Sequence, residues 1–430
     1  MRLFADLHIH SRFSRATSRT LNLEVLAQGA ELKGIKVIGT GDFTHPVWLD
    51  EIETGLRENG SGLYFLPGRK EISFMLTAEI STIYKQDGRV RKVHHLIGAP
   101  DMGVARRISE ALSKIGNINS DGRPIIGMSS RNLLDLVLNA SADAFIIPAH
   151  IWTPWFSALG SKSGFDSISE CYLDLAEHIF ACETGLSSDP PMNRMVKSLD
   201  AYFLVSNSDA HSADKLGREA TIFECEPGYY EMLNAMKTGS GLAGTIEFFP
   251  EEGKYHLDGH RDCGVTLEPD ETEKLNGRCP VCGKPLTIGV LYRVHELSDR
   301  VNGTAPKARP FDYAIPLKEL LGECFDVGPA SAKVERIYES LIKKLGPELN
   351  ILLDVPIEDI VKASDEKLGL AVSNMRSGRV IRKPGYDGVF GVISALKDAP
   401  AGMQKQMIEY ERPEINDETL RRRKEQLTLF

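Results

Sequence analysis

The chain has 430 residues, of which 42% are hydrophobic, so it can bury a large core and is expected to form two or three domains. Its formal net charge of −9 excludes a polycation that coats nucleic acid indiscriminately, and any such binding must be local. No run reaches the roughly 18 apolar residues that a membrane helix needs, and we expect a cytoplasmic monomer without a membrane partner.

Short apolar runs alternate with helical patterns in the first 245 residues. Residues 23–30 carry an apolar stripe of helical period between a capping Asn22 and Gly34, and residues 35–39 then read as a strand. The further strand-like runs are residues 74–79, 95–99, 144–149, 178–182 and 202–205, and helices are expected at residues 130–139 and 192–199. This alternation predicts an α/β fold whose sheet is parallel or mostly parallel.

Histidines and carboxylates stand at the ends of these runs. Because the carboxyl ends of strands in a parallel barrel open on one face, such side chains would meet there. Imidazole and carboxylate groups bind divalent metals and leave positions open for water and phosphate oxygens. Any one of these histidines alone is more simply explained as a hydrogen-bonded core residue. The set comprises His8, His10, Asp42, Glu79, His150, Glu183, Asp209 and His211, with His95 at the beginning of its run.

Five segments resemble the successive motifs of the PHP (polymerase and histidinol phosphatase) superfamily. They are residues 6–11 (Asp-Leu-His-Ile-His-Ser), residues 41–46 (Gly-Asp-Phe-Thr-His-Pro), the pair Glu79 and His95, residues 148–150 and residues 208–211. The resemblance implies a distorted seven-stranded (β/α) barrel with up to three divalent ions of zinc, manganese or magnesium. It implies one ion on His8, His10, Glu79 and Asp209, a second on Glu79, His95 and His150, and a third on His211.

The third metal position departs from the superfamily pattern. Many PHP domains have Thr-Asp-His after the second strand, whereas Phe43 here takes the place of a ligand. Asp42 or His45 could substitute, or could orient other ligands through hydrogen bonds. The resemblance implies hydrolysis by activated water, without a serine or cysteine nucleophile. The catalytic residues it implies are Asp209, Glu79, His8 and His10.

A second group of possible metal ligands lies further along the chain, where three of the seven cysteines gather. His260 and Cys263 have the same spacing as Cys279 and Cys282, and 15 residues separate the two pairs. Paired half-sites of this kind are typical of a closed structural zinc site, which would stabilise a module with little core of its own. His256 competes with His260 as the fourth ligand, and chance proximity of the cysteines is the less favoured explanation.

Three segments together with this module resemble the endonuclease Q family. They are residues 255–263, residues 279–283 (Cys-Pro-Val-Cys-Gly) and residues 385–391 (Gly-Tyr-Asp-Gly-Val-Phe-Gly). The resemblance implies a DNA repair endonuclease that cuts 5′ to deaminated bases (uracil, hypoxanthine, xanthine) and to abasic sites. A pocket could select deaminated bases, once extruded, by the carbonyl and ring N–H that deamination creates.

The chain is expected to divide into a PHP domain (1–245), a zinc-binding module (246–300), a helical DNA-binding domain (301–398) and a flexible tail (399–430). Trp152 and Trp155 offer stacking surfaces for DNA, although core packing explains them equally well. Lys333 could bind a DNA phosphate at a helix start, and a plain helix cap is the alternative.

The chain ends in Gln-Leu-Thr-Leu-Phe after a polar stretch. This pentapeptide resembles the motif by which bacterial repair proteins bind the sliding clamp, and in part the PCNA-binding box. Besides damaged DNA, we therefore expect the bacterial β clamp or PCNA as a partner. The anchors would be Gln426, Leu427, Leu429 and Phe430.

Two other functions fit part of these patterns. A PHP phosphomonoesterase acting on a small metabolite, as in the histidinol-phosphatase branch, would need neither the Cys/His module nor the helical region. A DNA-binding adaptor without activity would not need so complete a set of metal ligands. The sequence therefore favours the endonuclease.

Overall fold

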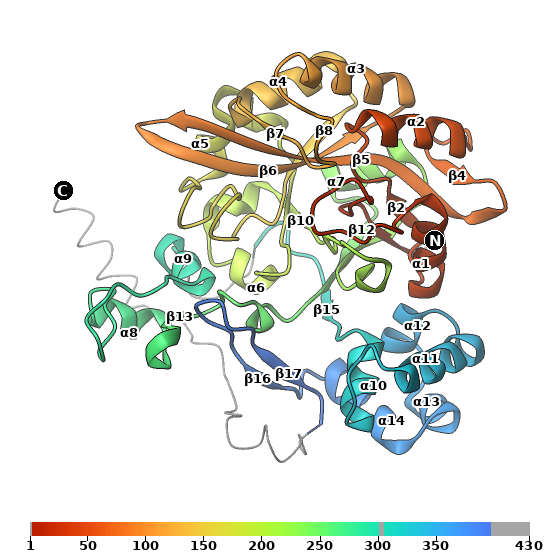
Figure 1. The fold of residues 1–430 in the computed structure, drawn as a ribbon, viewed down its shortest axis with the longest axis vertical. Helices are drawn as coiled ribbons and strands as arrows, with labels where there is room; N and C mark the ends of the chain where they lie inside the picture. The colour runs from red at the N-terminus through yellow and green to blue at the C-terminus, as the bar shows by residue number, and fades with distance from the viewer. Residues whose placement is uncertain (1, 301–304, 397–430) are drawn as a thin grey trace.

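The computed structural model describes residues 2–300 and 305–396 (Figure 1). The strands are β1 (Arg2–Asp6), β2 (Val37–Gly39), β3 (Arg57–Glu58), β4 (Tyr64–Leu66), β5 (Arg69–Gln86), β6 (Arg89–Ala99), β7 (Ile125–Ile126), β8 (Phe145–Pro148), β9 (Ala181–Glu183), β10 (Phe203–Val205), β11 (Ala220–Glu224), β12 (Leu242–Glu247), β13 (Asp258–His260), β14 (Val265–Leu267), β15 (Phe311–Tyr313), β16 (Ile381–Lys383) and β17 (Val392–Ser394).

Helices connect most of these strands. The α-helices are α1 (Leu23–Lys33), α2 (Pro46–Gly55), α3 (Met102–Ser113), α4 (Ser130–Ala140), α5 (Ile168–Tyr172), α6 (Pro190–Asn193), α7 (Tyr229–Thr238), α8 (Pro269–Lys274), α9 (Val290–Leu297), α10 (Leu317–Phe325), α11 (Ala332–Leu345), α12 (Glu348–Leu353), α13 (Ile357–Ala363) and α14 (Glu366–Arg376). Short 3-10 helices lie at η1 (Leu173–His178), η2 (Lys197–Ala201), η3 (Ala213–Lys215), η4 (Pro250–Glu252) and η5 (Arg261–Cys263).

The first helix begins and ends where the sequence predicts. The side chain of Asn22 accepts a hydrogen bond from the backbone N–H of Val25 at 3.0 Å and so caps α1. Gly34 ends the helix with φ of 85°, a left-handed conformation that favours glycine. The helix therefore leads directly into β2.

A ring of strands forms the centre of the molecule. β1 pairs in parallel with β2 and β2 with β5, while β6 is antiparallel to both β5 and β8. The N–H of Ile151 donates to the carbonyl of Glu183 at 3.2 Å, which links the end of β8 to β9, and β9 pairs in parallel with β10. The N–H of His10 donates to the carbonyl of Ala210 at 3.0 Å, so the segment after β10 returns to the end of β1.

The sheet is mixed, and the expectation of a mostly parallel sheet was wrong. β5 and β6 form one long hairpin instead of two separately connected strands. Asp87 and Gly88 join them with φ of 51° and 73°, the conformation of a tight two-residue turn. β11 adds a further antiparallel neighbour to β1 and pairs antiparallel with β12. The Asp-Gly pair was the sequence signal for this hairpin.

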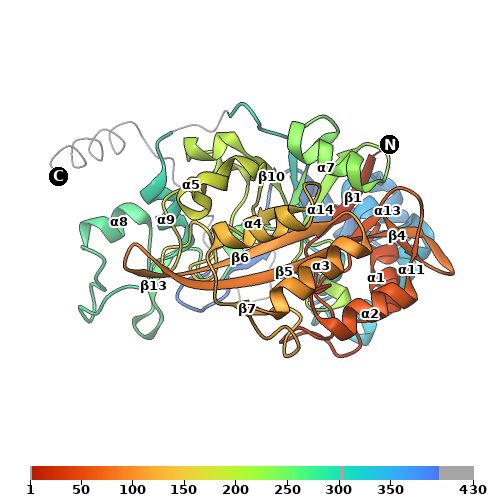
Figure 2. The same cartoon turned by 90° about the horizontal axis from the view of Figure 1, so that it is seen from above.

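Helices cover the strands from outside (Figures 1 and 2). α1 contacts β5, α3 contacts β6 and α4 contacts β8. The core between these layers is aromatic and aliphatic. Its largest fully buried side chains include Trp48, Trp152, Tyr172, Tyr229, Phe43, Phe74 and Phe165.

The predicted helical region is present as α10–α14, a group of helices beside the ring (Figure 1). β15 precedes it and pairs in parallel with β12, so the chain passes through the main sheet first. The Nζ of Lys33 on α1 lies 2.6 Å from a carboxylate oxygen of Glu348 on α12, and both side chains are buried. Among the helices of the described residues, none has the combined length and apolar character that crossing a membrane demands.

Candidate metal centre

Four predicted ligands meet at one end of the strand ring. His8 and His10 follow β1, Glu79 lies in β5, and Asp209 follows β10. The Nε2 of His10 lies 3.1 Å from Glu79 Oε2 and 3.0 Å from Asp209 Oδ1, and the Nε2 of His8 lies 3.4 Å from the same Glu79 oxygen. The four ligand atoms all lie within 4.8 Å of one another, and we call this group site A.

A second group shares Glu79 with the first. The Oε1 of Glu79 lies 2.6 Å from His94 Nδ1 and 3.2 Å from His150 Nε2. The two imidazole nitrogens are 3.2 Å apart. We call Glu79, His94 and His150 site B. Because one carboxylate oxygen faces each site, Glu79 is placed to bridge two cations.

The His8 side chain is held from behind by a buried carboxylate. The Nδ1 of His8 lies 2.9 Å from Oε2 of Glu183. The backbone N–H of His150 donates to the same oxygen, and the side chain of Asn207 donates to Oε1, both at 2.8 Å. A carboxylate at Nδ1 keeps the proton on that nitrogen and leaves the Nε2 lone pair facing site A. This Nε2 is buried and faces the carboxylate oxygens of Glu79 and Asp209 at 3.4 and 3.9 Å, which fits a metal ligand.

His10 and Asp209 have similar supports. The Nδ1 of His10 lies 3.0 Å from Asp42, and Asp42 also accepts a hydrogen bond from the backbone N–H of Ser11 at 2.7 Å. Asp6 accepts hydrogen bonds from the backbone N–H groups of Ser208 and Gly217, each at 3.0 Å. These bonds fix the loop that carries Asp209.

Three residues at the centre have left-handed backbone conformations. The φ angles are 49° for Asp42, 28° for His150 and 47° for Asp209. Residues other than glycine adopt this backbone conformation rarely, because it costs free energy. The surrounding hydrogen bonds must therefore stabilise it. Such conformations gather at functional sites, where they aim side chains that a regular strand would not.

The charges of the centre suit cation binding. Burial opposes ionisation of Glu79, but nearby cationic groups, Arg123 among them, hold its pKa well below the usual range. Burial lowers the pKa of His94 to about 4, so its imidazole is neutral at pH 7 and can donate a lone pair. Burial opposes protonation of His8 as well, but Glu183 and Glu79 raise its pKa, so a cation at site A would displace a proton.

Comparison with known proteins gives the family. The model for the MJ0043 C-terminal domain matches residues 316–379. An uncharacterised protein of Bacillus subtilis, YqxK, is 30% identical over 416 residues, 91% of this chain and 99% of the relative. The uncharacterised protein MJ0043 of Methanocaldococcus jannaschii is 33% identical over 273 residues, 61% of this chain, and the match spans only 33% of that protein.

Two solved structures match along almost the full length. The lesion-specific endonuclease Q of Pyrococcus furiosus is 30% identical, with a TM-score of 0.82 and coverage of 96% of this chain and 100% of that chain. The chain belongs to the endonuclease Q family. A further endonuclease Q, solved with a 27-mer duplex substrate that has an abasic lesion at the active site, is 30% identical with a TM-score of 0.81, covering 94% and 100%.

In this endonuclease Q family member, His94 takes the place that the sequence assigned to His95, which is a correction. The His95 Nε2 lies 2.9 Å from the hydroxyl of Thr82, and its Nδ1 lies 2.7 Å from the hydroxyl of Tyr172. Neighbouring residues on a strand point to opposite faces, and the pairing of β5 with β6 sets His94 on the face of Glu79. His95 therefore points away from site B.

The predicted third ligand set is not assembled. Asp42 contacts His10 as a support, and Phe43 is fully buried in the core. The Nε2 of His45 lies 3.1 Å from the carbonyl of Asn119, and among the described residues no group of three ligand atoms includes His45. The ring of His211 lies beside that of His10, with centroids 4.5 Å apart. Within residues 2–300 and 305–396, no group of three ligand atoms forms around His211.

Sequence reasoning missed Arg123. Its Nη1 lies 3.0 Å from Glu79 Oε2, and the charge of Glu79 raises the pKa of Arg123 above its usual range. The side chain is a quarter exposed and adjoins both sites. Arg123 comes from the loop between α3 and β7, where nothing in the sequence distinguishes it from any other loop arginine.

The residues predicted to contact DNA differ in their exposure to solvent. Trp152 is fully buried and donates from Nε1 to the side-chain oxygen of Asn193 at 2.8 Å, so it packs in the core and was wrong as a stacking surface. Trp155 is 43% exposed. Lys333 is exposed at the start of α11, with its Nζ 4.4 Å from the ring centre of Phe325. Residues 426–430, for which clamp binding was predicted, lie outside the described residues.

The Cys/His module brings its four ligands together. His260, Cys263, Cys279 and Cys282 offer ligand atoms within 4.8 Å of one another, and Cys282 Sγ lies 3.7 Å from His260 Nδ1. His256 is buried away from this group and lines a cavity instead. The donor set fits a tetrahedral zinc ion with no open position.

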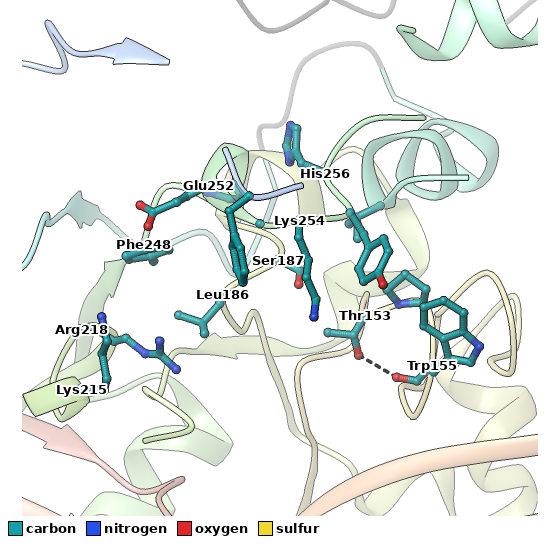
Figure 3. A pocket seen from close by; sticks show the side chains of 16 residues that line it. Thr153, Trp155, Leu186, Ser187, Lys215, Arg218, Phe248, Glu252, Lys254 and His256 are labelled. Carbon is teal, nitrogen blue, oxygen red and sulfur yellow. Dashed lines mark hydrogen bonds between the residues drawn. The ribbon is translucent and has the colours of Figure 1, made fainter. Parts of the chain in front are cut away.

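A cavity of about 510 Å³ has two lining residues that contact site B or the loop that carries Asp209. Its wall includes Thr153, whose hydroxyl lies 3.1 Å from His150 Nδ1, and Arg218, whose Nε donates to the carbonyl of Ser208 at 2.9 Å. Figure 3 shows Arg218 on one side of this cavity and Trp155 on the other. The cavity thus reaches from the ligand-bearing loops to aromatic side chains.

Proposed function

We propose that this chain is a metal-dependent endonuclease that hydrolyses the phosphodiester 5′ to deaminated bases (uracil, hypoxanthine, xanthine) and to abasic sites in DNA. The observation that carries the proposal is the pair of sites that share Glu79, near a cavity with room for a nucleotide. The ring of strands would be the distorted (β/α)7 barrel of the PHP superfamily. The Cys/His module would hold one structural zinc ion.

The residues of sites A and B would divide the work of holding two divalent ions. His8, His10 and Asp209 would hold one, His94 and His150 the other, and Glu79 both. Adjacent cations, when bound, supply the Lewis acidity that activates water and neutralises phosphate charge. Glu183 and Asp42 keep the histidine tautomers that cation binding requires.

Arg123 would act on the substrate directly. Its guanidinium lies beside Glu79 and is charged at any working pH. A phosphodiester that approaches site A gains negative charge on its oxygens as the P–O bond breaks, and a fixed cation there stabilises that charge. Removing Arg123 would therefore reduce the rate of hydrolysis more than the affinity for the substrate.

The cavity explains how deaminated bases would be selected. Deamination replaces an exocyclic amine, a donor, with a carbonyl, an acceptor. Lys215 and Arg218 line the cavity, and their side chains are hydrogen-bond donors only. The carbonyl of a deaminated base can pair with such a donor, whereas the amine of a normal base cannot. Glu252 also lines the cavity, and an oxygen of its carboxyl group can accept a hydrogen bond from the ring N–H. Trp155 adds an aromatic face for stacking.

The known relatives support the same class of substrate. The endonuclease Q that was solved with DNA has an abasic lesion at its active site. An abasic nucleotide has no base to recognise, so its selection would depend on the ease of extruding it from the duplex. One cavity near one metal centre would then bind both the abasic nucleotide and the deaminated base.

A single incubation tests the proposal. A labelled duplex with one uracil or hypoxanthine is incubated with the protein and Mn²⁺, Mg²⁺ or Zn²⁺, with an undamaged duplex and a chelator as controls. We expect a metal-dependent nick on the 5′ side of the lesion only. Release of phosphate from small esters without nicking would indicate the phosphomonoesterase, and DNA binding without any product would indicate the adaptor.

The carboxyl-terminal pentapeptide is proposed to bind the sliding clamp through Gln426, Leu427, Leu429 and Phe430. Deletion of residues 426–430 should weaken binding to purified β clamp or PCNA at least tenfold and leave the nicking of a free oligonucleotide as it was. Equal clamp affinity with and without the pentapeptide would remove this part of the proposal.

A further inference from the structure

The loop between β16 and β17 presents apolar side chains to solvent. It consists of residues 385–391, and we call it the aromatic loop. Phe390 is 69% exposed and Val389 is 36% exposed. Neither sites A and B nor the Cys/His module uses these side chains. Two neighbouring exposed apolar side chains beside a cavity make this loop a candidate binding surface.

The aromatic loop is rigidly built. Tyr386 and Val389 exchange two backbone hydrogen bonds of 3.0 and 2.8 Å across a tight turn, in which Asp387 and Gly388 have φ of 42° and 84°. The carboxylate of Asp387 accepts the backbone N–H of Arg261 and the hydroxyl of Thr287, both at 2.6 Å. The exposure of Phe390 is therefore a property of an ordered turn.

The loop is also anchored to the wall of the cavity. The backbone N–H groups of Gly385, Gly388 and Gly391 donate to the carbonyls of Glu251, Lys254 and Glu252 at 2.8, 2.9 and 2.9 Å. A Cβ at Gly391 would lie 2.1 Å from the carbonyl oxygen of Glu251, so only glycine allows this approach. The segment that anchors the loop contributes Glu252, Gly253 and Lys254 to the cavity lining.

The surroundings of Phe390 suit a nucleic acid. Phe390 lies at the cavity itself, among its lining residues. The Nζ of Lys254 lies 5.7 Å from the Phe390 ring centre and 5.5 Å from that of Tyr255. An exposed phenyl ring beside a cation can enter a base stack while the cation meets a phosphate.

We propose that the aromatic loop inserts Phe390 into the base stack of duplex DNA and occupies the space left by the nucleotide that enters the cavity. The inference rests on the proposed function, because it requires a duplex from which one nucleotide is extruded. Apolar wedges between base steps unstack them, and a filled gap keeps the extruded nucleotide from returning. The occupant of this surface is thus the damaged duplex itself.

The test compares two substrates of one sequence. One has uracil in a fully paired duplex, and the other has the same uracil within a short unpaired bubble that needs no opening. For Phe390→Ala, we expect the ratio of nicking rates, paired over unpaired, to fall at least tenfold relative to the wild type. Phe390→Leu should restore most of that ratio. Tyr230→Ala on α7 removes another aromatic side chain, 51% exposed, and should leave the ratio unchanged.

A second readout separates the two proposals. 2-Aminopurine placed beside the uracil reports unstacking by its fluorescence when the protein binds, and every protein compared also has Asp209→Ala so that no nick forms. The wild type should increase it, and Phe390→Ala should increase it less than half as much. An unchanged nicking ratio, or equal fluorescence, would overturn the insertion. If the wild type nicks neither substrate, the proposed function fails, and the fluorescence still decides whether Phe390 inserts.

Discussion

The ligands of sites A and B come from strands and loops that are far apart in the sequence, whereas those of the Cys/His module all lie between residues 260 and 282. His8 and Glu79 are fully buried, but Cys282 is exposed. Glu183 and Asp42 hold the histidines of site A. We therefore expect the fold to shape the first centre before a cation binds, and the second centre to depend on a bound ion.

The contrast between the two centres predicts different consequences when their ions are removed. A preformed centre that loses its cations should keep its structure and lose its chemistry, since strands and buried carboxylates still hold the ligands. A small module with little core should lose its structure when zinc is removed, because the binding free energy of the ion is part of its folding free energy. Each prediction below tests one side of this contrast.

The largest effect is expected for Asp209→Ala. Asp209 contributes a ligand atom to site A, and its side chain is a quarter exposed, so the loss should spare the fold. We expect nicking of uracil-containing duplex to fall by about 10³-fold. Gel-shift titration should show DNA affinity close to that of the wild type. Full nicking by a variant of verified metal content would contradict the assignment of site A.

His94→Ala and His95→Ala form a matched pair on adjacent residues. His94→Ala should remove the ion of site B and lower nicking by about 100-fold, as loss of metal-site contacts does. His95→Ala should keep the ion but lower the free energy of unfolding by roughly 2 kcal/mol, because Thr82 and Tyr172 lose a buried partner. Mass spectrometry measures the metal content and urea unfolding measures the stability. Loss of the ion in His95→Ala but not in His94→Ala would refute the assignment of His94 to site B.

Cys279→Ser should affect the other centre. We expect the bound zinc to fall by one ion per chain and the segment around α8 to become sensitive to limited proteolysis. Nicking should fall roughly tenfold or less, because sites A and B remain. Cys225→Ser, at a cysteine outside the module, should retain the zinc. Loss of the ions of sites A and B together with this zinc would mean that the two centres are not independent.

The smallest effect concerns pH. Burial lowers the pKa of His95 to about 3 in the folded chain, against an ordinary value of 6.5 in the unfolded chain. Between these values the unfolded chain binds more protons, so the stability that neutral His95 contributes is lost as pH falls below 6.5, by roughly 1.4 kcal/mol per pH unit. His95→Gln should reduce this slope in urea unfolding at pH 7 and pH 5. Parallel slopes for both proteins would exclude a buried neutral His95.

Much of the centre could be predicted because its ligands follow local patterns. His8 and His10 alternate on one strand end, and Asp209 stands in a short motif, so their residue types and spacing already indicate metal chemistry. The four ligands of the Cys/His module are also local. Arg123 could not be predicted, because a loop arginine acquires its role only from the carboxylate that the fold sets beside it.

The sequence by itself determined which residue types are available for metal binding, where α1 begins and ends, and that the chain alternates strands and helices. Only the tertiary structure decided which of two adjacent histidines faces Glu79, and that Trp152 is core while Phe390 is exposed. The physical reason is that the chemistry of a side chain is intrinsic, whereas the direction in which it points depends on strand register and on packing between distant segments.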